Sequence, residues 1–164
     1  MDRLARLIAT FFGSGYFPIA PATFASAIVA GILFLLGPGD GALAGIAGRG
    51  HPLIEGLIII ALFPLSIAAA HQAEKSLGHD ASPIVIDEVL GQMITLWFVP
   101  RTWPWILAGF LLFRLFDIWK PLGANEAQNL PGGWGIVADD VMAGIYAFAL
   151  LQGALLLLPM ISGR

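Results

Sequence analysis

The stretch ADDVMAGIYAFALLQGALLLL, residues 138–158, decides the fold. After the acidic pair Asp139-Asp140 it runs from Val141 to Leu158 without a charged side chain, which is typical of a helix that crosses a membrane. An ionised carboxylate at the centre of such a helix costs about 2.5–3.5 kcal/mol on insertion scales. We therefore expect the acidic pair to open the helix at one edge of a bilayer, with Asp139 as the N-cap.

The rest of the chain is similarly apolar. Of its 164 residues 58% are hydrophobic and 12% are charged, and the mean hydropathy is +0.85. Soluble domains carry about 25% charged residues. The composition therefore predicts an all-α, polytopic membrane helix bundle that forms one membrane-embedded domain over residues 1–164. A net charge of −3 without a Lys/Arg run argues against nucleic acid as a partner, and the lack of cysteine excludes disulfides and thiolate chemistry.

Four further apolar segments bring the expected number of membrane spans to five. They are residues 24–36, 53–70, 84–99 and 105–116. The first is short, so it should begin at Pro21 if it crosses the bilayer. Residues 3–12 predict a short N-terminal interfacial helix with Arg3 and Arg6 on its polar side. With the N-terminus in the cytoplasm, more basic residues fall inside than outside, as the positive-inside preference requires.

This topology places the polar segments on one side of the membrane. They are residues 13–23, 79–88, 114–120 and 130–140. They occur alternately at the end of one span and the start of the next. We infer a single site at the cytoplasmic membrane interface.

Acidic residues suggest a metal site. Asp87 and Glu88 enter the segment 84–99, and Asp139 and Asp140 precede the last span. Carboxylate oxygens are the protein ligands that Mg²⁺ prefers. The competing interpretation is a capping pair, because negative charge in the first turn of a helix suits its dipole. That interpretation does not explain why two acids enter an apolar segment.

Basic residues lie near these acids. Arg114 and Asp117 share a face at the end of the fourth span, and Lys120 lies three residues further on. An arginine offers a planar fork to phosphate, whereas a lysine offers a point charge. An interfacial salt bridge, with Lys120 reaching lipid headgroups, is the alternative. Beside several acids, the pair favours recognition of a phosphate and a metal together.

Weaker signals come from loops. Gly132 and Gly133, within LPGGWG, could turn backbone N–H groups toward an anion, although glycine-rich connections are common. Ser14 and Thr23 lie in a Gly/Pro loop with no Walker motif. His79, beside Asp80, could be an acid/base or a metal ligand, while a solvated loop histidine is the more common case.

Three segments taken together resemble the phosphatidylglycerophosphatase A family. They are GSGYFPIAPATFAS at 13–26, IVIDEVLG at 84–91, and FRLFDIWKP with LPGGWGIVADDVMAG inside 113–144. The resemblance extends over residues 5–146. It departs from the family pattern at Ala22 and Ala25, where the family has glycines. The family consists of Mg²⁺-dependent lipid phosphatases of the bacterial inner membrane, which convert phosphatidylglycerophosphate to phosphatidylglycerol.

The resemblance implies an active site built from the matched polar residues. We assign metal binding to Asp87, Glu88, Asp139 and Asp140. We assign catalytic roles to Asp117, Arg114, Lys120, His79 and Asp80. We assign contacts with the substrate phosphate to Arg114, Lys120, Gly132, Gly133, Ser14 and Thr23.

Other functions stay open. Carboxylates in membrane helices also mark ion transporters, which would place them near the midplane. A phosphotransferase acting on CDP-lipids would carry a DGxxAR pattern, and none follows Asp117. A phosphatase of another lipid phosphate, such as phosphatidic acid, would need the same chemistry.

Overall fold

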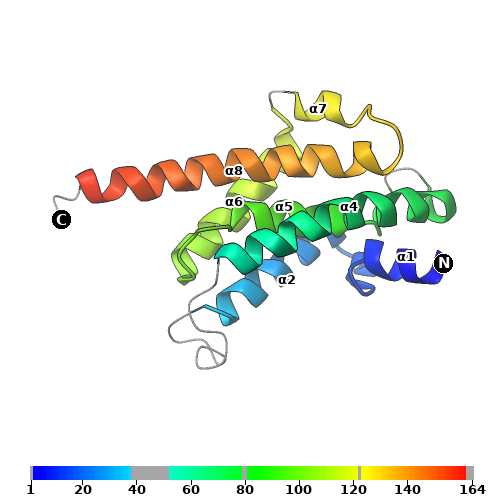
Figure 1. Ribbon diagram of the computed structural model, residues 1–164, viewed down its shortest axis with the longest axis horizontal. Coiled ribbons are helices and arrows are strands. Elements are labelled where there is room, and N and C mark those ends of the chain that lie inside the picture. The colour runs from blue at the N-terminus through cyan, green and yellow to red at the C-terminus, as the bar shows by residue number, and fades with distance from the viewer. Residues whose placement is uncertain (1, 38–51, 79–80, 122, 162–164) are drawn as a thin grey trace.

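The computed structural model describes residues 2–37, 52–78, 81–121 and 123–161, and within these ranges every regular element is a helix (Figure 1). The all-α class is therefore confirmed. The α-helices and one 3-10 helix (η1) are α1 (Asp2–Ala9), η1 (Ser14–Tyr16), α2 (Pro21–Leu35), α4 (Pro52–Leu77), α5 (Ile86–Thr95), α6 (Trp103–Trp119), α7 (Ala124–Ala127) and α8 (Gly133–Ile161).

The helices form an elongated bundle with α5 at its centre. Helices α4 and α8 contact each other and extend along most of the molecule in Figure 1. Helix α5 contacts α2, α4, α6 and α8, and its Leu90 is fully buried. Helix α1 packs against α4. The central position of α5 matters because its first turn carries Asp87 and Glu88.

Two described helices are long and apolar enough to cross a membrane. They are Pro52–Leu77 and Gly133–Leu158. Helix α5 has 10 residues. At 1.5 Å per residue it is about 15 Å long, which is half the thickness of a bilayer core. The structure thus supports a membrane protein, while the five crossings and the interfacial position of α1 stay predictions.

The last helix begins earlier than the sequence predicts. Helix α8 starts at Gly133, so Asp139 and Asp140 lie in its second turn, and the prediction of Asp139 as an N-cap is wrong. Gly132 precedes the helix with φ +60°, and a Cβ at Gly133 would lie 2.1 Å from the Ile67 carbonyl oxygen. These glycines let the chain turn into a helix directly against α4.

The second helix begins at Pro21, as its length requires. Proline is well suited to the first turn of a helix. Ala22 and Ala25 lie inside α2, where a right-handed helical backbone suits alanine. The left-handed backbone before α2 is at Ala20, with φ +49°. The two alanines that replace family glycines therefore cause no backbone strain.

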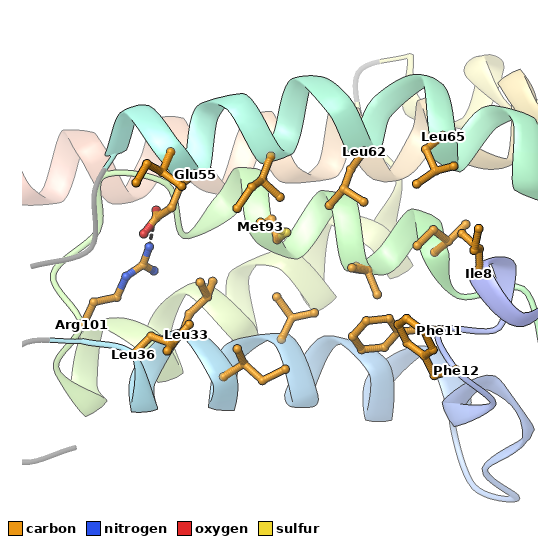
Figure 2. Close-up of a pocket in the computed structure, with 16 residues that line it drawn as sticks. Ile8, Phe11, Phe12, Leu33, Leu36, Glu55, Leu62, Leu65, Met93 and Arg101 are labelled. Atoms are coloured by element: carbon orange, nitrogen blue, oxygen red, sulfur yellow. Dashed lines mark hydrogen bonds and ion pairs between the residues drawn. The ribbon is translucent and has the colours of Figure 1, made fainter. Parts of the chain in front are cut away.

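An apolar groove runs between α2 and α4 across one face of α5, and Figure 2 shows its lining. Its volume is about 450 Å³. Ile8, Phe11 and Phe12 lie at one end. An ion pair between Arg101 and Glu55 lies at the other end. Both charged side chains are largely buried, so removal of either one would leave an uncompensated charge at the end of the bundle opposite the start of α5.

Candidate active site

Two glycines let α5 and α8 approach closely. A Cβ at Gly91 would lie 2.7 Å from the Asp140 carbonyl oxygen, and one at Gly144 would lie 2.6 Å from the Gly91 carbonyl oxygen. The Thr95 hydroxyl donates to the Gly91 carbonyl at 2.9 Å. Each glycine follows an acidic residue by one helical turn, Asp87 on α5 and Asp140 on α8. The glycine contact therefore brings the two acids together.

Three carboxylates form a cluster at this contact. Asp87, Glu88 and Asp140 each place an oxygen within 4.8 Å of the others. Asp87 is 6% exposed and Asp140 is 3% exposed. Asp87 Oδ1 accepts a hydrogen bond from the Glu88 backbone N–H at 3.1 Å. Glu88 Oε2 and Asp140 Oδ2 have no hydrogen-bond partner among the described residues. Gathered carboxylate oxygens with free lone pairs, shielded from water, fit a divalent cation such as Mg²⁺.

Helix α6 adds Arg114 and Asp117 to the cluster. Arg114 Nη1 lies 2.5 Å from Asp117 Oδ2, and both side chains are mostly buried. Asp117 also lies close enough to Asp140 for the two side chains to interact. The predicted pairing of Arg114 with Asp117 thus exists beside the carboxylates, where it supplies positive charge without leaving an isolated ion in an apolar bundle.

Asp139 points to a different set of partners from Asp140. Lys120 Nζ donates to Asp139 Oδ2 at 2.5 Å, and Gln128 Nε2 donates to the same oxygen at 2.8 Å. Asp139 Oδ1 has no partner among the described residues. Adjacent residues of a helix point about 100° apart, so one aspartate faces the cluster while its neighbour faces Lys120.

Lys120 stays charged in this position. Burial by itself lowers the pKa of an ammonium group, but here the hydrogen bond to Asp139 and the nearby negative charges outweigh it. The net result is a pKa of Lys120 raised above its ordinary value of 10.5. The residue ends α6 with φ +49°, a left-handed backbone that directs the chain toward α7.

Two amides were missed by sequence reasoning. Gln128 holds Asp139, as described above. Gln92 follows Glu88 by one turn of α5, is fully buried, and has neither side-chain polar atom partnered among the described residues. A buried amide without partners is costly unless a ligand or water satisfies it. A glutamine one turn after Glu88 within an apolar segment is a signal that could have identified it.

Ser14 lies in η1 and Thr23 in α2, both in the N-terminal part of the chain. The Ser14 hydroxyl donates to the Thr10 carbonyl at 3.3 Å, and Thr23 lies in the first turn of α2. A Cβ at Gly15 would lie 2.1 Å from the Pro83 carbonyl oxygen, so this loop packs on the segment that enters α5.

Gly132 and Gly133 pack against α4. A Cβ at Gly132 would lie 2.3 Å from Nδ1 of His71. Close helix packing thus accounts for both glycines. His79 and Asp80 lie outside the described residues.

Comparisons with known proteins identify the family of this chain. The family model described as Phosphatidylglycerophosphatase A matches residues 7–155. A Bacteroides thetaiotaomicron protein named "Putative phosphatidylinositol-3-phosphatase" is 41% identical over 152 residues, which cover 90% of this chain and 91% of that protein. Phosphatidylglycerophosphatase A of Escherichia coli is 34% identical over 150 residues, covering 88% and 80%.

A third relative, Phosphatidylglycerophosphatase A of Haemophilus influenzae, is 38% identical over 147 residues, covering 86% of this chain and 82% of that protein. No solved structure gives a significant match. The family match extends through α5, α6 and most of α8, which carry the clustered carboxylates and the basic residues beside them. The chain is a phosphatase that belongs to the phosphatidylglycerophosphatase A family.

Proposed function

We propose that this protein removes the terminal phosphate of phosphatidylglycerophosphate to give phosphatidylglycerol, with Mg²⁺ as its cofactor, at the cytoplasmic face of a bacterial inner membrane. The observation that carries the proposal is the cluster of Asp87, Glu88 and Asp140 with Arg114 and Lys120 beside it. Acids alone would repel a phosphate. Acids that hold a divalent cation, flanked by fixed cations, attract one.

Asp87, Glu88 and Asp140 would hold the metal. Their oxygens come from two helices that the glycine contact keeps together, so the donor set is formed before binding. A Mg²⁺ ion bound there supplies positive charge to the phosphoryl oxygens as negative charge develops on them. Asp139, the fourth predicted metal ligand, lies outside this three-residue group, and its Oδ2 is held by Lys120 and Gln128.

The neighbouring residues bind and orient the phosphate. Arg114 presents a planar fork and Lys120 a point charge to the non-bridging oxygens. Asp117 orients the guanidinium of Arg114 through their ion pair. Asp117 lies outside the three-carboxylate group, and we assign it as the acceptor of a proton from an attacking water molecule.

The substrate is tested by measuring phosphate release from purified protein in detergent. The panel contains phosphatidylglycerophosphate, phosphatidylinositol 3-phosphate and phosphatidic acid, each with Mg²⁺ and with a chelator. We expect the highest kcat/KM on phosphatidylglycerophosphate, and reversible loss of turnover on chelation. The name of the Bacteroides relative makes the phosphoinositide the main rival. Preference for it would overturn the assigned substrate, and full activity in chelator would overturn the assigned cofactor.

An ion transporter is the second class of protein that must be distinguished from a phosphatase. Cation flux into liposomes, measured on the same preparation, should be absent while phosphate release continues. The position of the carboxylates favours the enzyme, because they lie at the start of α5 and in the second turn of α8. An ion pathway would require such groups near the middle of the spans.

A further inference from the structure

A hollow between α6 and α8 begins at Lys120. Its volume is about 660 Å³, and it is lined mainly by Phe116, Trp119, Lys120, Tyr146, Ala149 and Leu150. The Phe116 ring stacks on Trp119 with centroids 6.4 Å apart and meets Tyr146 edge to face at 5.9 Å. The hollow is therefore open and mainly apolar with one cationic group, and that group already belongs to the candidate active site.

Helical spacing connects the hollow with the site. On α8, Tyr146 follows Asp139 by seven residues and Leu150 follows it by eleven, which places all three on one stripe. Phe116 lies in the last turn of α6, Lys120 directly follows that helix, and both line the hollow. The lining residues of the two helices thus lead to the Lys120–Asp139 ion pair.

The length and exposure of the hollow suit one lipid chain. From Asp139 to Leu150 the rise along α8 is about 16 Å, which is close to one leaflet of a bilayer core of about 30 Å. Trp119 is 67% exposed and Leu150 is 52% exposed, so the hollow is open along its side to the surroundings of the bundle. An acyl chain can enter from the side without leaving an apolar medium.

The groove of Figure 2, unlike the hollow, has no connection with the candidate active site. Ile86, Val89 and Met93 form its wall on α5, whereas Gly91 on another face of α5 packs against α8. Its polar end is the Arg101–Glu55 ion pair, and no residue of the carboxylate cluster lines it. The groove is therefore a matched control for the hollow.

We propose that the hollow between α6 and α8 holds one acyl chain of the phospholipid substrate and thereby places its phosphate beside Lys120. This inference rests on the proposed lipid phosphatase function. Hydrocarbon is as apolar in the bilayer as in the hollow, so burial of the chain adds little affinity. The contribution is position, because a displacement of about 1 Å at a reacting centre can cost about 100-fold in rate.

The test fills the hollow and compares two substrates. Ala149→Trp and Leu150→Trp add bulk at exposed positions, and Ile58→Trp adds it in the groove of Figure 2. The substrates are dioleoyl phosphatidylglycerophosphate and its deacylated, water-soluble counterpart. We expect kcat/KM for the dioleoyl substrate, divided by kcat/KM for the deacylated one, to fall about tenfold or more in the two hollow variants. The added tryptophan would push the acyl chain aside and thereby displace the attached phosphate. The ratio should hold in Ile58→Trp.

Two outcomes would overturn the inference, and a second readout covers inactive or unfolded variants. An unchanged ratio in folded Ala149→Trp and Leu150→Trp would exclude the hollow as the chain site, and so would an equal fall in Ile58→Trp.

A phosphatidylglycerol with a photoreactive acyl chain should label α6 and α8 of the wild-type protein, whereas labelling confined to α2 and α4 would contradict the inference. Wild-type protein that releases no phosphate from any lipid would defeat the proposed function itself, and labelling would still decide the position of the chain.

Discussion

Asp140 connects the packing of the bundle with its chemistry. Its backbone carbonyl lies against Gly91, and its carboxylate completes the cluster with Asp87 and Glu88. We expect Asp140→Asn to lower phosphate release by at least about 100-fold, the usual scale for losing one preorganised electrostatic group. Glu126→Gln is the matched control, because Glu126 is an exposed acid on α7. Equal activity of Asp140→Asn and the control, at equal protein in the membrane fraction, would refute the metal assignment.

Lys120 gives a prediction about pH. A raised pKa keeps its ammonium group protonated below its ordinary value of 10.5, and the stabilisation from the ion pair is lost only as the pH rises above that value. Lys120→Met should therefore lower kcat/KM by a constant factor between about pH 6 and 9, where the wild-type lysine does not titrate. Lys120→Arg should retain more activity. A pH-dependent factor would show that another group near Lys120 carries the effect.

Most acids of the site are predictable from the sequence because charge is rare in apolar segments. Asp87, Glu88 and Asp140 are distinctive for this reason. Gln92 gives a weaker signal, as a polar amide one turn after Glu88 in an apolar segment, and Gln128 gives none, since an uncharged amide in a loop is not distinctive. The different partners of Asp139 and Asp140 depend on the rotation of α8, which only the packed structure defines.

The contact between α5 and α8 is the element on which the site depends. Gly91→Ala would place a methyl group 2.5 Å from the Phe113 ring and 2.7 Å from the Asp140 carbonyl oxygen. We expect a loss of about 1–3 kcal/mol in stability, as for other overpacked interiors, and lower activity from separated carboxylates. Thermal melting and phosphate release measure the two effects.

The matched control for this change is Gly153→Ala, on α8. A Cβ at Gly153 would meet no atom within 4 Å, and alanine favours a helix over glycine by up to about 1 kcal/mol. This variant should melt at the same or a higher temperature with unchanged activity. Gly91→Ala that behaved like Gly153→Ala would mean that α5 and α8 are not held together at the glycines.

The helix boundaries show where sequence reasoning stops. Hydropathy predicts the existence of α2, α4, α6 and α8, because each of these helices corresponds to a long apolar segment of the sequence. It fails at the start of α8, where Gly132 and Gly133 resemble a loop but pack against α4. It also overestimates α5, because residues 96–99 are apolar yet lie beyond the end of the helix.

At the scale of the molecule, the arrangement in the membrane is open to a direct test. The natural chain has no cysteine, so single-cysteine variants have no background in labelling. Ser82 lies just before α5 and Thr102 just before α6, and both are exposed. A membrane-impermeant maleimide added to intact spheroplasts should label Thr102→Cys and spare Ser82→Cys until the membrane is opened. The reverse pattern would place the site outside the cytoplasm.

Hydropathy alone cannot decide how many helices cross the bilayer. The segment 84–99 is apolar because α5 is surrounded by other helices, and a fully buried helix has the same composition as one that faces lipid. The packing of neighbouring helices around α5, where Leu90 is fully buried, distinguishes a helix enclosed by protein from one that faces lipid.

The length of α8 has a consequence for how deep the reaction takes place. Its 29 residues rise about 43 Å, which equals a whole bilayer including both headgroup layers. Asp140 lies seven residues from Gly133, about 10 Å below that end of the helix. Because each headgroup layer is about 5–7 Å thick, this depth places Asp140 just inside the hydrocarbon core, directly beneath the headgroups of that leaflet. A substrate could then react by lateral diffusion alone, without being lifted out of its leaflet, and its product would return to the same plane.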